Sequence, residues 1–140
     1  MRRTLAVMAI GVGLLVLGRV PVLAHHAFSS EFDGNRPVQM TGTVTKKEWV
    51  NPHSWIHVDV KKPDGTVENW AIEGGTPNTL LRRGLRKTDL PAGTVIKITG
   101  FQAKDGGLRA NGKDLTLADG RQMFLGSSGT GAPAEPGAGK

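Results

Sequence analysis

The histidines are the residues of this 140-residue chain whose type and spacing best suggest chemistry. There are four, and they form two short clusters: His25 with His26, and His53 with His57. A chain cut after Ala24 would begin at His25, whose α-amine and imidazole could chelate one metal ion. His26 could add its imidazole and the intervening amide nitrogen. Nitrogen-rich, tetragonal coordination of this kind suits Cu(II), with Zn(II) as the alternative for the same ligands.

The second cluster could supply one further ligand to the N-terminal pair. His53 and His57 share one face of a predicted strand, four residues apart, which is about 13 Å along a straight strand. Both could reach one ion only if Pro52 bends the chain and redirects His53. We therefore expect one of them to join the N-terminal histidines. The competing interpretations are structural: a polar mature terminus, a turn-capping His53 and a solvated, outward-facing His57.

Trp55 indicates a second kind of site, which would need no metal. It lies opposite the apolar face of its strand, where an outward aromatic ring could stack on a small ligand or on part of a partner protein. Asn51, His57 and Arg82 would add polar groups to such a face. The competing interpretation is that Trp55 covers the barrel mouth or packs under the N-terminal arm. The alternative function is thus a metal-free adaptor for a ligand or an envelope protein.

Nothing in the sequence indicates an active site. There is no cysteine, which excludes a disulfide scaffold, a thiolate zinc site and a cysteine nucleophile. The carboxylates show no spacing that marks an acid–base pair, and no serine lies in a nucleophile-elbow motif. We expect a binding or accessory module rather than an enzyme.

The first 24 residues have the pattern of a secretory signal peptide. A basic start, Met1–Arg3, precedes the uncharged apolar run Leu5–Gly18, and Val22–Ala24 supplies a cleavage site. The apolar run is short for a membrane span, which needs about 20 residues. An uncleaved anchor is the alternative. We therefore expect a periplasmic protein with no stable membrane anchor after cleavage.

Removal of this leader changes the charge of the chain. The full sequence has 18 Lys and Arg against 12 Asp and Glu, a net charge of +6. Three of the arginines lie in residues 1–24, so the mature chain has 15 basic residues against 12 acidic ones and a net charge of +3. We expect no nucleic-acid partner for an exported chain with so small an excess.

The remaining chain reads as one small β domain. Alternating or β-branched runs predict strands at 38–50, 53–62, 66–73 and 94–101, and a strand pair or one long bent strand at 108–124. One short helix is predicted at 77–83, with Thr76 as N-cap and Gly84 at its end. This order is typical of a five-stranded OB-like Greek-key barrel over residues 38–125, with an open sandwich as the alternative. Residues 25–37 would form an N-terminal arm, and the Gly/Pro/Ala-rich residues 126–140 a disordered tail.

Several motifs make the sequence resemble DUF6152, a family of small exported bacterial proteins of unknown function. The matching stretches are His25–Asp33, Thr41–Val44, Glu48–Trp55 with its Asn-Pro-His motif, Asn69–Ala71, Leu80–Gly84, Lys104–Gly106, Ala110–Asn111 and Asp119–Arg121. The resemblance extends from His25 to about residue 128. It implies an exported β-barrel module and no particular activity or cofactor.

Overall fold

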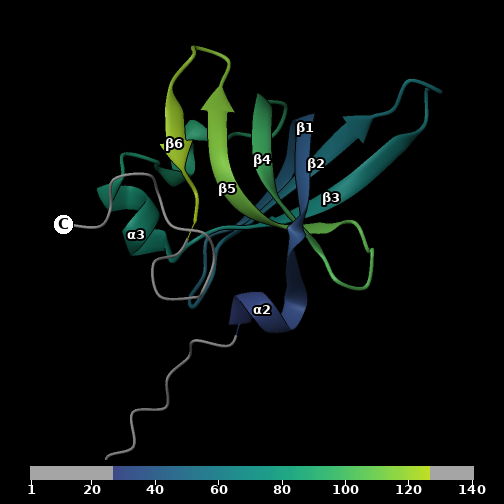
Figure 1. The fold of residues 1–140 in the computed structure, drawn as a ribbon. Coiled ribbons are helices and arrows are strands. Elements are labelled where there is room, and N and C mark those ends of the chain that lie inside the picture. Colours follow the sequence, from purple (N-terminus) through teal and green to yellow (C-terminus); the bar gives the residue numbers. More distant parts are fainter. Residues whose placement is uncertain (1–26, 127–140) are drawn as a thin grey trace, which may run out of the picture.

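The computed structural model describes residues 27–126, in which six strands form one sheet that closes on itself (Figure 1). The elements in chain order are α2 (Ala27–Glu31), β1 (Phe32–Glu48), β2 (Trp55–Lys61), β3 (Val67–Glu73), α3 (Pro77–Arg82), the 3-10 turn η1 (Lys87–Asp89), β4 (Val95–Ala103), β5 (Arg109–Leu117) and β6 (Gln122–Phe124). None of the helices in this range is long and apolar enough to cross a membrane.

The sheet has the order β3-β2-β1-β4-β5-β6, and a parallel pairing of β3 with β5 closes the ring. β1 is long enough to belong to two antiparallel pairs. Its first part pairs with β4 from Pro37 to Thr43, and its second part pairs with β2 from Thr43 to Glu48. A register shift between Val44 and Lys46 lies in this second part, and such a bulge bends a strand. One long strand therefore serves both halves of the barrel.

The core lies inside the ring and comes from the inward face of each strand. β2 and β3 show the alternation that the sequence predicts, with Ile56, Val58, Trp70 and Ile72 buried. The other buried members of this core cluster are Met40, Val44, Leu80, Leu85, Leu90, Ile96, Ile98, Ala110, Leu115, Leu117 and Leu125. A separate small cluster lies where α2 meets the barrel and consists of Phe28, Phe32 and Ala103, with Trp55 and Phe101 packed against it.

α3 connects β3 to the second half of the barrel, and its ends are those that local sequence rules predict. The Thr76 side chain accepts a hydrogen bond from the main-chain N–H of Thr79, and Pro77 occupies the first turn. Gly84 follows with φ of +89°, a left-handed conformation in which a side chain would be disfavoured. Leu80 is the side chain that α3 buries in the core.

The all-β class, the β2–β3 hairpin and the predicted helix between the third and fourth strands are confirmed, whereas α2 and the 3-10 turn η1 are additional to the one helix that was predicted. The closer assignment to an OB barrel stays a prediction. Two boundaries differ from the sequence analysis. β1 begins at Phe32, so residues 32–37 of the expected arm are strand, because Phe32 packs on Ala103 of β4. The expected five strands are six, because the turn at Ala118–Gly120 separates β5 from β6.

Candidate functional site

His53 lies in the loop that joins β1 to β2 and contacts a carboxylate deep in the barrel wall. Its Nδ1 meets Oε1 of Glu73, the last residue of β3. The Glu73 side chain is 7% exposed and the His53 side chain 21% exposed, so the pair runs from the interior to the surface. A cis peptide bond joins Asn51 to Pro52 just before this histidine. When Nδ1 carries the proton, its N–H donates a hydrogen bond to the Glu73 carboxyl group. The lone pair of Nε2 is then free to bind a metal ion or accept a proton.

Glu73 is held in place from both neighbouring strands. It pairs with Trp55 of β2 on one side and with Asn111 of β5 on the other, at the point where the ring closes. The buried side chain of Asn111 also hydrogen-bonds the Glu73 carboxyl group. Glu73, His53 and Asn111 therefore form a connected polar chain whose outermost member is an imidazole.

Burial raises the pKa of Glu73 above its usual value. Removal of the carboxylate from water is the main cause, and the nearby charge of Glu31 acts in the same direction. His53 and the Asn111 hydrogen bond oppose this shift, because both favour the ionised form. Burial is the larger effect, so this carboxylate is costly to keep ionised.

The N-terminal segment lies over the same end of the barrel. Figure 1 shows α2 below the barrel, at the start of β1. Phe28 of α2 packs with Phe32 and Ala103, and Trp55 packs against this cluster. The Glu31 carboxylate at the end of α2 lies 3.6 Å from the guanidinium of Arg109, at the start of β5. Because Trp55 pairs with Glu73, α2 lies close to the polar chain described above.

His57 belongs to a different environment. It lies within β2, and its Nε2 is 3.2 Å from Oε1 of Glu48, the last residue of β1. Lys46 also binds this oxygen, at 2.7 Å. His53 and His57 thus turn to two different carboxylates, one buried and one on the outer surface. The structure does not bring them together, as expected from their spacing.

The three residues predicted to bind a metal-free ligand come from separate elements. Trp55 is half-buried against the Phe28 and Phe32 cluster, in line with the interpretation that it packs under the N-terminal arm. Asn51 is exposed in the loop before His53. Arg82 is exposed on α3, where its guanidinium lies 3.4 Å from the Thr79 hydroxyl. Ligand binding by this set stays a prediction.

His25 and His26 lie outside the described residues, as do the predicted leader and residues 127–140 of the predicted tail. Gly126, the first residue of that predicted tail, is described and buried, and its main-chain oxygen accepts a hydrogen bond from Arg83. Within residues 27–126, no three His, Cys, Asp or Glu side chains form a group that could hold a metal ion. The described residues alone therefore contain no complete metal site. His53 could act as a ligand only together with ligands from elsewhere, such as the N-terminal histidines.

Sequence reasoning missed Glu73 and Asn111. Both look unremarkable in the sequence, because their role depends on the pairing of β3 with β5. A partial signal was present in the β2–β3 hairpin. Its turn at Pro63–Gly65 sets a register in which Glu73 lies opposite Trp55, two residues from His53. A hairpin register worked out from the turn would have placed this carboxylate beside the histidine.

The raised pKa of Glu73 gives a prediction about stability. A carboxyl group with a raised pKa in the folded state stabilises the fold below its unfolded pKa, and this contribution is lost as the pH rises through the folded pKa. We therefore expect the free energy of unfolding of Glu73→Gln to increase relative to that of the wild type as the pH rises from 4 to 7. Urea unfolding at pH 4, 5, 6 and 7 measures this difference.

Glu68 is the matched control because its pKa is lowered, chiefly by a hydrogen bond from Trp70 and a second one from Lys62. Its contribution is present above its unfolded pKa and lost as the pH falls. Glu68→Gln should therefore change in the opposite direction over the same pH range. If the stability of both variants relative to the wild type changed in the same direction with pH, the assignment of the buried charge to Glu73 would be contradicted.

Comparison with known proteins gives one match. The family model described as a family of unknown function, DUF6152, matches residues 13–112. The searches of curated proteins and of solved structures found no match. The matched range includes the His53 loop, Glu73 and Asn111. Because this range covers more than half of the sequence, the chain belongs to the DUF6152 family.

Proposed function

We propose that this chain is an exported, non-catalytic accessory module that binds one copper ion. His25 and His26 would supply the N-terminal chelate, and His53 would add an imidazole from the barrel. Cu(II) is the preferred ion and Zn(II) the alternative. The observation that carries the proposal is the contact of His53 Nδ1 with buried Glu73, which leaves Nε2 for a metal.

This arrangement matches the way in which proteins prepare a metal-binding histidine. Such histidines donate the second ring N–H to a carboxylate, which fixes the tautomer and raises the basicity of the ligating nitrogen. Here Glu73 is the carboxylate that accepts from the histidine, and Asn111 hydrogen-bonds Glu73. His57 is the weaker candidate, because its Nε2 already faces Glu48.

Chain connectivity supports a role for the N-terminal histidines together with His53. His26 directly precedes Ala27, the first residue of α2, and two residues of chain span at most about 7 Å. The Phe28 cluster packs against Trp55, two residues from His53. Docking of α2 would therefore keep the N-terminal ligands near the barrel ligand at a high effective concentration.

A Cu(II) titration of the exported protein tests this proposal. The full sequence, leader included, is expressed, and an intact mass confirms that the purified chain begins at His25. We expect one-to-one binding, with nitrogen couplings in the electron paramagnetic resonance spectrum. His53→Ala should weaken binding by about 100-fold or more, because loss of a ligand should cost at least as much as loss of an outer-shell partner, which costs about 10–100-fold.

Two controls separate the ligands. His57→Ala should bind copper as the wild type does, because its imidazole lies with Glu48. A chain with one extra residue before His25 should bind much more weakly, since its α-amine is displaced from the chelate. Equal affinity of His53→Ala and wild type would remove His53 from the site, and equal affinity of the extended chain would remove the N-terminal chelate.

A further inference from the structure

β1 and β2 separate at one end of the sheet and leave a wedge between them. β2 pairs with β1 only as far as Asp59, opposite Thr43, whereas β2 itself continues to Lys61 alongside β3. On its other side, β1 pairs with β4 from Pro37 onward. The segment of β1 from Pro37 to Gly42 therefore has a neighbouring strand on one side only. In Figure 1 the β2–β3 hairpin projects to the upper right of the barrel.

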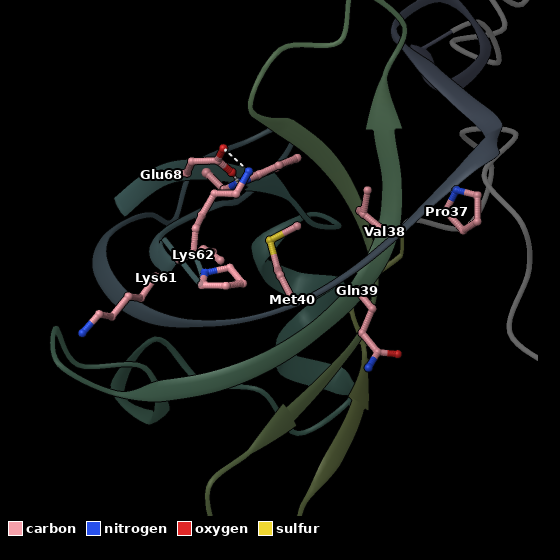
Figure 2. A pocket seen from close by; sticks show the side chains of 10 residues that line it. Pro37, Val38, Gln39, Met40, Lys61, Lys62 and Glu68 are labelled. Atoms are coloured by element: carbon pink, nitrogen blue, oxygen red, sulfur yellow. Dashed lines mark hydrogen bonds and ion pairs between the residues drawn. The ribbon is translucent and has the colours of Figure 1, made fainter. Parts of the chain in front are cut away.

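A cavity of about 420 Å³ occupies this wedge. Met40 and Trp70 form its floor, and each is 8% exposed. Figure 2 shows Met40 directed from β1 toward Lys62 and Glu68, while Gln39 points to the other side of the strand. The remaining apolar lining comes from Pro37, Val38, Val60 and Pro63. Its size lies within the range of about 300–1,000 Å³ that is usual for ligand sites.

The main chain of β1 also presents free hydrogen-bonding groups to the wedge. Val44 N donates to Thr94 O, and Gly93 N donates to Val44 O, each at 2.8 Å, so the main-chain groups of Val44 face the β4 side. Main-chain direction alternates along an antiparallel strand. Thr41 and Gln39 therefore direct their N–H and C=O groups away from β4 and into the wedge. No strand in the described range pairs with them there.

Two lysines lie on the rim of the wedge, and only one of them is neutralised by an ion pair in the described part of the chain. Lys62 Nζ lies 3.1 Å from Glu68 Oε1, and the Trp70 indole N–H donates to Glu68 Oε2 at 3.0 Å. Glu68 is therefore already engaged with groups of the cavity itself. Lys61 is exposed and makes no ion pair within residues 27–126. The rim keeps an unmatched cation next to an unpaired strand edge.

We propose that the wedge binds a short, extended, acidic peptide segment of a partner protein, which adds as a strand to the free edge of β1. Its main chain would pair with Gln39 and Thr41, one apolar side chain would enter the cavity over Met40 and Trp70, and a neighbouring Asp or Glu would face Lys61. Strand addition gives affinity through main-chain hydrogen bonds and specificity through pockets for alternate side chains. Pro37 has no N–H, so the added strand ends there.

The unpaired edge favours a peptide over a small amphiphilic molecule. An aliphatic ligand would fill the apolar floor, but it would leave the polar main-chain groups of Gln39 and Thr41 without partners. A peptide strand satisfies both features at once. This site is separate from His53 and Glu73, so it does not depend on the proposed copper binding.

A displayed library of random heptapeptides, selected on the immobilised protein in the presence of a metal chelator, tests the proposal. We expect enrichment of alternating apolar residues with Asp or Glu. The most enriched sequence is then synthesised with a fluorescent label, and its binding is followed by anisotropy. Lys61→Glu should weaken binding at least tenfold. Lys87→Glu, a charge reversal at an exposed lysine on η1, should leave binding unchanged.

Gln39→Pro tests the main-chain pairing directly. It removes the N–H that faces the wedge, whereas the hydrogen bonds to β4 come from the neighbouring residues and should be retained; circular dichroism verifies the fold. We expect at least a tenfold loss of peptide binding. A selected pool without acidic enrichment would overturn the proposal, as would wild-type affinity in either Gln39→Pro or Lys61→Glu. So would decanoate binding in the cavity in a protein that selects no peptide, because the wedge would then be an amphiphile site.

Discussion

Gly100→Ala is expected to destabilise the barrel by about 3 kcal/mol, at the upper end of the usual cost of overpacking a core. A Cβ atom at Gly100 would lie 2.2 Å from the main-chain oxygen of Asn111, and that oxygen belongs to β5. Gly100 of β4 pairs with Gly112 of β5, so two strands approach closely where neither has a side chain. Relief of the clash would require β5 to move, and β5 is the strand that closes the ring against β3.

Urea unfolding at neutral pH measures this effect, with Gly74→Ala as the matched control. Gly74 is also buried, but a Cβ there would come no closer than 3.6 Å to any neighbour, which is an ordinary contact. We expect this control to stay within about 1 kcal/mol of the wild type. Because Asn111 also hydrogen-bonds Glu73, Gly100→Ala should disturb the polar chain at His53 as well. A Gly100→Ala barrel as stable as the wild type would show that β4 and β5 are not in close contact here.

Phe28→Ala is expected to release α2 from the barrel and, with it, the proposed copper chelate. The Phe28 ring packs edge-on against Phe101, with a centroid distance of 5.7 Å, and against Phe32 at 6.0 Å. Truncation of a buried phenylalanine costs about 3 kcal/mol or more, which is roughly a hundredfold change in an equilibrium. The Phe28 cluster is separate from the main core, so we expect most of the loss to be local to α2.

Hydrogen exchange and copper titration together measure this effect. Main-chain protection should fall over α2 and the start of β1 while the core strands stay protected. Cu(II) affinity should fall in parallel, because the N-terminal ligands would no longer be held near His53. Val67→Ala, at an apolar side chain that is 58% exposed on β3, is the control and should change neither measurement. If main-chain amides of α2 exchanged faster while the Cu(II) affinity stayed the same, docking of α2 would not be needed for metal binding, contrary to this prediction.

Sequence patterns predicted the local elements of this fold well. The β2–β3 hairpin follows from strict alternation on either side of Pro63–Gly65, and both strands bury the side chains that the alternation assigns to the core. The ends of α3 follow from Thr76 and Gly84. These features depend on residues within a few positions of one another, so periodicity and capping preferences are sufficient to predict them.

The start of β1 and the contact of Asn111 with Glu73 could not be predicted in this way. Phe32 belongs to a strand because it packs on Ala103, which lies about seventy positions along the chain. Glu73 lies beside His53 at the open end of the β2–β3 hairpin, where the hairpin register places it, but Asn111 reaches Glu73 only because β3 and β5 pair in parallel. A linear pattern contains no information about which distant strand will be the neighbour.

The sequence by itself determined the β class, the hairpin, the helix ends and the two pairs of histidines as candidate ligands. Tertiary structure decided that His53 and His57 face different carboxylates, that Trp55 packs beneath α2, and that β1 keeps a free edge at Gln39 and Thr41. The physical reason is that the former depend on short-range sterics and side-chain alternation. The latter depend on ring closure, which brings β3 to β5, buries Glu73 beside His53, and parts β1 from β2 beyond Thr43.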